Sequence, residues 1–225
     1  MSSIHSVVLN EDVSILATLL NNGLNPDELD DHGQTALFLA ARNDHFDAVV
    51  LLVEHGASTE KQYNPMAPLY IASSYGHSNI VKFFLESGVS PNQKTDGGYT
   101  PLHIAAHRGY PDVVKNLLEH GAHFDGKDKH GNTPLHVACL GGNVEVIKAL
   151  LEKNNNLCGE KNNVGRTPLH NAAHYGHLDA IKILLEFNAS LDEKDLSGYT
   201  PLDLAKITKE QNVIEYLSSY QELPS

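Results

Sequence analysis

The chain lacks tryptophan and contains only two cysteines among its 225 residues. Cys139 and Cys158 do not form a pair at metal-ligand spacing, which argues against a disulfide scaffold and a thiolate zinc site, and fits a reducing compartment. No segment approaches the roughly 20 apolar residues that cross a bilayer, and the N-terminal residues lack the pattern of a secretory leader. We therefore expect a cytoplasmic protein without membrane contacts; the nucleus and delivery into a host cell stay open.

Basic residues are also scarce. Lysine and arginine number 16 against 28 acidic residues, which gives a formal net charge of −12. Such a field repels the phosphates of nucleic acid, so we expect no nucleic-acid partner. Hydrophobic residues make up 41% of the chain and charged residues 20%, which is ordinary for a folded protein with a sizeable core.

What the chain does contain is an internal repeat. Three copies of the pattern Thr-Pro-Leu-His-x-Ala begin at Thr100, Thr133 and Thr167, and weaker copies begin at Thr35, Ala67 and Thr200. The leucines of the six copies lie at positions 37, 69, 102, 135, 169 and 202, so the steps are 32, 33, 33, 34 and 33 residues. A constant period of this length is the signature of a repeat protein.

The residue types within each period predict two helices. Threonine caps a helix N-terminus, and proline is tolerated at the first helical position. Glycines such as Gly109 are expected to end the first helix in the left-handed conformation, and glycines such as Gly121 to end the second. Asn154 and Asn188 stand at this second position in later units, where we expect them to be left-handed too. A further glycine before each threonine predicts a turn in the connecting loop.

The repeated pattern resembles the ankyrin repeat over nearly the whole chain. The resemblance implies an all-α solenoid of about seven stacked helix–turn–helix units with projecting β-hairpin or turn loops. We expect one domain over residues 1–225, with an N-terminal cap at 1–29 and a C-terminal capping repeat at 195–225. The intervening repeats are expected near residues 30–61, 62–94, 95–127, 128–161 and 162–194.

We expect no catalytic residue, no cofactor and no metal site, and therefore no enzyme. His103, His136 and His170 occupy the fourth position of the pattern, where histidine is part of the repeat itself. His107 and His174 lie four residues after two of them, a spacing that suits a metal, but further ligands are not apparent. Cys139 is expected in the core, whereas Cys158 lies in the extended segment after Asn154, where it could be exposed, although nothing nearby argues for catalysis.

The resemblance implies a non-catalytic protein-binding module whose contacts come from the loop tips and the exposed ends of the first helices, which line a concave face. Five of the nine tyrosines and all three arginines fall at these variable positions, and both residue types are enriched at binding hot spots. The candidate partner-binding residues are Arg42, Tyr63, Met66, Tyr75, Tyr99, His107, Arg108, Lys129, His130, Arg166, His174, Tyr175 and Tyr199.

The variable positions differ in charge from the rest of the chain. They carry four cations against two acids, Asp31 and Asp96, inside a chain of net charge −12. We therefore expect one or more protein partners that present acidic or hydrogen-bonding groups, and a chain that is monomeric on its own.

Three alternatives stay open at this point. The protein could be an adaptor, inhibitor or assembly subunit of a larger complex such as a ubiquitin ligase, a kinase complex or a proteasome. It could be a bacterial effector that acts on host-cell partners. It could instead be an enzyme with a histidine site, or a nucleic-acid or small-ligand binder, and these are the readings that the residues favour least.

Overall fold

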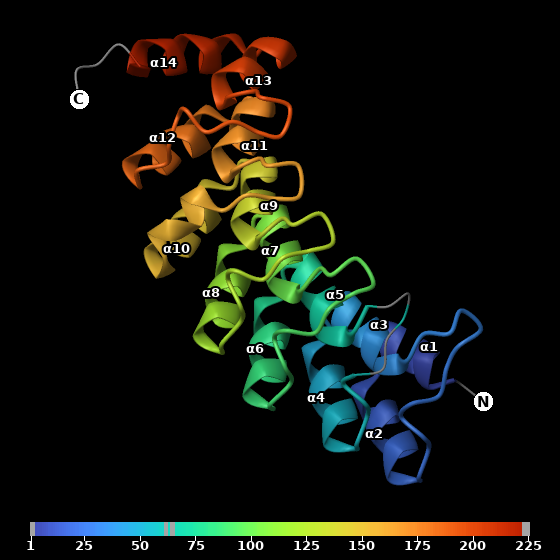
Figure 1. Cartoon of the computed structure of the whole chain (residues 1–225). Helices are drawn as coiled ribbons and strands as arrows, with labels where there is room; N and C mark the ends of the chain where they lie inside the picture. Colours follow the sequence, from blue (N-terminus) through green and yellow to red (C-terminus); the bar gives the residue numbers. More distant parts are fainter. Residues whose placement is uncertain (1–2, 61–62, 64–65, 222–225) are drawn as a thin grey trace.

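The computed structural model describes residues 3–60, 63 and 66–221, and over these residues the protein is an all-α solenoid (Figure 1). The α-helices are α1 (Ile4–Leu9), α2 (Val13–Asn21), α3 (Ala36–Arg42), α4 (Phe46–Glu54), α5 (Pro68–Tyr75), α6 (Ser78–Glu86), α7 (Pro101–Arg108), α8 (Pro111–Glu119), α9 (Pro134–Gly141), α10 (Val144–Lys153), α11 (Pro168–His174), α12 (Leu178–Glu186), α13 (Pro201–Thr208) and α14 (Gln211–Gln221). A short 3-10 helix, η1 (Asn155–Gly159), follows α10.

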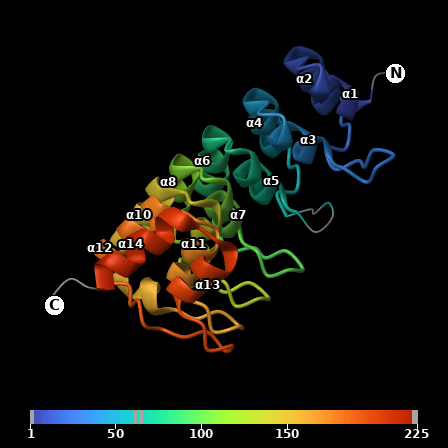
Figure 2. The same cartoon turned by 90° about the horizontal axis from the view of Figure 1, so that it is seen from above.

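The helices form two rows. The odd-numbered, first helices lie side by side in one row, and the even-numbered, second helices lie in the other (Figure 1). The connecting loops project beyond the row of first helices (Figure 2). Only isolated bridges, Leu29 with Thr35 and Tyr63 with Met66, represent β structure in the described part of the chain, so these loops are turns rather than ladders of paired strands.

Histidines of the repeated pattern connect each first helix to the next loop. In α7, α9 and α11 the N-cap threonine and the histidine three residues later form a capping box. The Thr133 hydroxyl donates to His136 Nδ1 at 2.9 Å, and His136 Nε2 donates to the carbonyl oxygen of Arg166 at 3.0 Å. His103 and His170 reach the carbonyls of Asn132 and Tyr199 in the same way, at 3.1 and 3.0 Å. We call these three residues the bridging histidines.

A second series of contacts runs back to the preceding repeat at the turn between the two helices. His77 Nε2 donates to Arg42 O at 3.0 Å, and His177 Nε2 donates to Leu140 O at 2.9 Å. Asn143 fills the same role with an amide that reaches the carbonyl of His107 at 2.9 Å. The carbonyls of Arg42, His107 and Leu140 lie at the C-terminal ends of first helices, where they have no partner within the helix, and these contacts join their repeats to the next ones.

The left-handed positions follow the sequence expectation with one exception. Gly109 has φ +76°, and Asn188 and Lys209 adopt φ +64° and +63° where other repeats have glycine. Asn154 has φ −160° and ψ 109°, so the expectation of a left-handed residue there is wrong. The extended conformation at Asn154 redirects the chain into η1, and the Asn154 side chain caps that turn by accepting from Asn156 N at 3.0 Å.

The extra segment after α10 packs into the core. Leu157 is 2% exposed and Cys158 is 6% exposed, so Cys158 is buried, and the exposure that the sequence left open does not occur. Burial raises the pKa of the Cys158 thiol to about 11, and Cys139 is fully buried. Both cysteines are free thiols that serve as small apolar residues.

Leu157→Ala should lower the free energy of unfolding by about 2–4 kcal/mol, because it removes a buried leucine side chain and leaves a cavity in the core. Asn156→Ala, at an exposed position of the same turn, is the matched control and should change little. Urea denaturation followed by circular dichroism measures both. Equal, small effects would show that the segment is not part of the core.

Stability should also fall as the pH is lowered from about 6.5 to about 4. Burial lowers the pKa of His136 from 6.5 to about 4, so the unfolded chain takes up a proton in this window while the folded protein does not. The contribution is complete above pH 6.5 and amounts to about 3 kcal/mol lost by pH 4. Urea denaturation at several pH values should show a smaller loss for His136→Gln than for the unaltered protein. Parallel pH curves would contradict the role of His136.

Candidate functional site

The first helices and the projecting loops form a surface that we call the groove face. Tyr75 and Tyr175 at the ends of α5 and α11 are each 53% exposed, and Tyr199 on the last loop is 43% exposed. The other exposed candidates on this face are His107, Arg108, Lys129 and His130. The half-buried candidates are Arg42, Tyr63, Met66, Tyr99, Arg166 and His174.

Two hollows adjoin one another on the groove face between α5, α7 and α9. The smaller, about 240 Å³, is lined by residues that include Tyr99, His107 and Leu140. The larger, about 520 Å³, is lined by residues that include Met66, Tyr75 and Arg108. Both share Tyr70 and Ile104, so these two side chains form the floor between them. The structure therefore brings together candidates from two consecutive repeats, and a third repeat completes the lining.

Tyr70 is a site residue that the sequence reasoning missed. It stands at the fourth pattern position, where later repeats have a bridging histidine, and the N-cap before it is Ala67, which provides no side-chain hydrogen bond. Burial raises the pKa of Tyr70, with a further contribution from Tyr99, while the nearby charge of Arg108 lowers it. The signal was present in the sequence, since Ala67 and Tyr70 depart together from the threonine–histidine pair.

Tyr99 lines the smaller hollow together with Tyr70. Its ring meets that of His103 edge-on, with centroids 6.1 Å apart. Burial raises the pKa of Tyr99, and the charge of the nearby Asp128 carboxylate raises it further.

The three arginines differ in their availability. Arg166 Nε lies 3.4 Å from Asp195 Oδ2 in the next loop, and the Asp195 side chain is only 4% exposed. Over the described residues, Arg42 and Arg108 take part in no ion pair within 4.0 Å, so their guanidinium groups are free to meet a partner. Arg166 instead joins two neighbouring loops, a role that its position in the repeat did not reveal.

A separate aromatic cluster lies on the C-terminal repeats, with α9 between it and the two hollows. His174 and Tyr175 meet edge-on with ring centroids 4.8 Å apart. Burial, together with the charge of Arg166, lowers the pKa of His174. The loop tips nearby carry Val164, 53% exposed, and Leu196, 80% exposed, neither of which was among the candidates. Val164 and Leu196 could have been chosen from the sequence, because both are apolar residues at loop-tip positions.

Successive loops are bonded to one another along the groove face. Lys129 N donates to Gly97 O, Asn163 N to His130 O, and Leu196 N to Val164 O, each at 3.0 Å. Asp128 Oδ1 additionally accepts from the backbone of His130 and Asn132 at 2.8 Å, which fixes its own loop. The loops from residue 95 onward therefore form a preformed edge to the groove.

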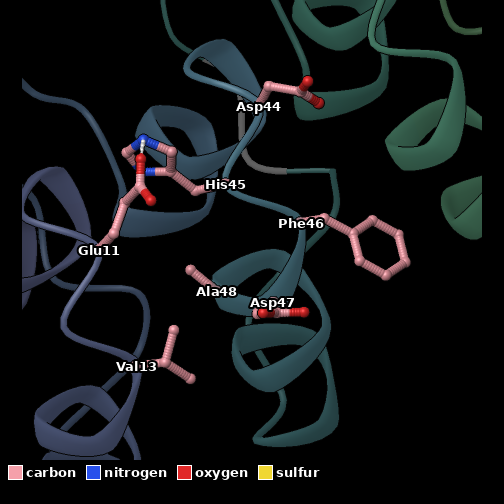
Figure 3. Close-up of a pocket in the computed structure, with 7 residues that line it drawn as sticks. All are labelled: Glu11, Val13, Asp44, His45, Phe46, Asp47 and Ala48. Carbon is pink, nitrogen blue, oxygen red and sulfur yellow. Dashed lines mark ion pairs between the residues drawn. The ribbon is translucent and has the colours of Figure 1, made fainter.

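A further hollow of about 310 Å³ lies between the turns that follow α1 and α3 (Figure 3). His45 Nε2 lies 2.9 Å from Glu11 Oε1, and His45 Nδ1 donates to Val8 O at 2.9 Å. Asp44 and Phe46 point away from the Glu11–His45 pair (Figure 3). These side chains do not converge on a common point, and His45 has both ring nitrogens engaged in joining two repeats.

Within residues 3–60, 63 and 66–221, no group of three or more His, Cys, Asp and Glu side chains is placed to hold a metal ion. His103 and His170, the first members of the pairs with metal-capable spacing, use both ring nitrogens in the repeat itself. The described helices also include none that is long and apolar enough to span a membrane.

Comparison with known families shows to which family the chain belongs. A family profile described as "Ankyrin repeats (3 copies)" matches three overlapping segments, residues 4–95, 69–158 and 154–224. The chain belongs to the ankyrin-repeat family. The structure agrees, because each ankyrin repeat is a helix pair with a projecting loop.

Ankyrin proteins of several kinds are similar to this chain. It is 35% identical over 100 residues to "Putative E3 ubiquitin-protein ligase XBAT31" of Arabidopsis thaliana, which covers 44% of this chain and 22% of that protein. It is 34% identical over 87 residues to the human "Ankyrin repeat and SOCS box protein 3", covering 37% and 17%. It is 35% identical over 88 residues to "Glycerophosphocholine phosphodiesterase gde1" of Schizosaccharomyces pombe, covering 38% and 8%. The chain thus spans less than a quarter of the length of these relatives.

Replacing the ion-paired Arg166 should change the free energy of unfolding more than replacing Arg108. Arg166→Gln should lower the free energy of unfolding by about 1 kcal/mol, because the buried Asp195 carboxylate loses its ion-pair partner. Arg108→Gln should stay within about 0.5 kcal/mol of the unaltered protein, as expected for an exposed group without a partner. Urea denaturation of the two variants in parallel tests this difference. A larger loss for Arg108→Gln would reverse the assignment.

Proposed function

We propose that this ankyrin protein is a non-catalytic module that binds a partner protein through the groove face, as an adaptor, scaffold or inhibitor. Ankyrin repeats are protein–protein interaction modules. The observation that carries the proposal is the combination, on one face, of exposed Tyr75 and Tyr175 with Arg42 and Arg108, which form no ion pair with any described residue. Tyrosine and arginine supply large contact areas and directional hydrogen bonds at low ordering cost.

The mechanism we propose is rigid presentation. The backbone bonds between successive loops and the bridging histidines fix the groove before a partner arrives. A preformed surface loses little conformational freedom on binding, so more of the contact energy appears as affinity. The partner we expect presents acidic or hydrogen-bonding groups, because the unpaired side chains on this face are cationic or amphipathic. The setting we propose is the cytoplasm.

A role as a subunit of a ubiquitin ligase is the second candidate. Its support is the similarity to the protein named "Putative E3 ubiquitin-protein ligase XBAT31". Only repeat regions are shared with that relative, as the covered share of 22% shows, so the similarity extends to the binding module and not to the rest of that protein.

Replacing Tyr75, Arg108 and Tyr175 together by alanine should weaken retention of the partner by more than about 10-fold in affinity capture from native lysate. All three side chains are exposed, so the variant should keep the circular dichroism spectrum of the unaltered protein. Quantitative mass spectrometry of the captured proteins gives the ratio for each of them.

The matched control is a triple alanine variant at Asp112, Lys148 and Glu186, exposed residues of the second helices α8, α10 and α12. Proteins lost with the groove-face variant but kept by this control identify the partner. Proteins lost only with the control, or kept by both variants, would place the interface away from the groove face and overturn the proposal.

A further inference from the structure

The two adjoining hollows have a composition unlike the rest of the protein. Neither is lined by an aspartate or a glutamate, although the chain carries 28 acidic residues and a net charge of −12. The larger hollow is lined in part by Arg108, which takes part in no ion pair among the described residues. Among the described residues, the lining of the two hollows therefore contains no acidic side chain and offers an available cation, although the Asp128 carboxylate lies close enough to Tyr99 and His103 to act on their pKa values.

The smaller hollow offers an apolar floor with polar groups at its edge. Ile104, Val137 and Leu140 supply the aliphatic surface, and Tyr70 and Tyr99 also line the hollow. Ile104 and Leu140 are only half-buried, so apolar surface stays open to solvent inside the hollow. At about 240 Å³ the space suits a single large apolar side chain rather than a whole folded element.

The two hollows share a floor, so a ligand that fills one lies next to the other. Tyr70 and Ile104 line both, and Tyr75 and Arg108 lie in the larger one. The first helices α5, α7 and α9 lie in one row (Figure 1), and Tyr99 and Asn132 from the preceding loops also line the smaller hollow. An elongated ligand with one apolar and one anionic group would meet both parts at once.

We propose that these hollows bind one extended, acidic segment of the partner protein, which inserts an apolar side chain between Tyr70, Tyr99 and Ile104 and pairs a carboxylate with Arg108. This inference rests on the proposed function and narrows it to a partner chemistry and to three repeats. The apolar side chain is expected to provide the contact area, and the carboxylate to provide the preference for an acidic sequence.

The test uses four pools of fluorescein-labelled synthetic nonapeptides with degenerate flanking positions. The first pool has a central Leu or Phe followed two residues later by Glu or Asp. The second replaces the acid by Gln or Asn, the third replaces the apolar residue by Ser, and the fourth replaces the acid by Lys. Fluorescence anisotropy with the full chain gives the dissociation constant of each pool.

The first pool should bind about 10-fold more tightly than the second and the third, and the fourth should bind most weakly, since a charge-assisted pair contributes about this factor. Arg108→Gln should remove the difference between the first and second pools. Lys148→Gln, which removes the same charge from the exposed face of α10, should leave that difference unchanged. Ile104→Trp should fill the smaller hollow and weaken the first pool about 10-fold.

Arg108 is exposed, so its replacement tests the proposal even if Ile104→Trp fails to fold. Equal binding of the first two pools, an equal loss with Lys148→Gln, or no binding of any pool would overturn the acidic-segment proposal. If no peptide pool binds while the groove-face triple variant still loses its partner in affinity capture from lysate, the acidic-segment inference is wrong and the proposed function stands. If the triple variant also keeps every captured protein, the proposed function falls with it.

Discussion

The fold depends on one repeated interaction, the bridging histidine between a capped helix and the next loop. In α7, α9 and α11 the imidazole accepts from its threonine and donates to a carbonyl of the following repeat, at 3.1 Å from His103 and 3.0 Å from His136. This contact requires a buried, neutral ring, and burial accordingly lowers the pKa of both histidines. Where the pair is replaced by Ala67 and Tyr70, the tyrosine lines both hollows, and the bridging His103 of the next repeat lines the smaller one as well. The candidate site thus lies between a repeat that lacks the regular contact and one that keeps it.

Much of the architecture could be predicted from the sequence, because its rules act within one repeat. Threonine, proline and glycine specify where a helix begins and ends through backbone geometry alone, and α7 and α9 follow these expectations. Asn154 and Cys158 escaped prediction because the extra residue there changes the path of the chain, and packing against neighbouring repeats then decides which side chain is buried. The pattern identified which positions vary, but not which of them contact each other.

In the candidate site, too, some residues could be predicted from one repeat and others depend on contacts between repeats. Tyr75 and Arg108 could be chosen from their positions in the repeat, since those positions lie at exposed helix ends. The ion pair between Arg166 and Asp195, and the role of Tyr70 as a floor between two hollows, depend on contacts between successive units. Spacing along the chain carries no information on such contacts. The candidates form one group around α5, α7 and α9 and another around Tyr175, and the spacing of the repeats does not predict this division either.

The acceptors used by the bridging histidines are main-chain oxygens, those of Asn132, Arg166 and Tyr199. A carbonyl is supplied by every amino acid, so the contact that joins two units places no demand on the side chain at the accepting residue. The same residues can therefore change their chemistry without loosening the array. Structural cohesion and recognition are assigned to different atoms of one residue, which lets a solenoid of this kind acquire new binding specificity while its framework stays intact.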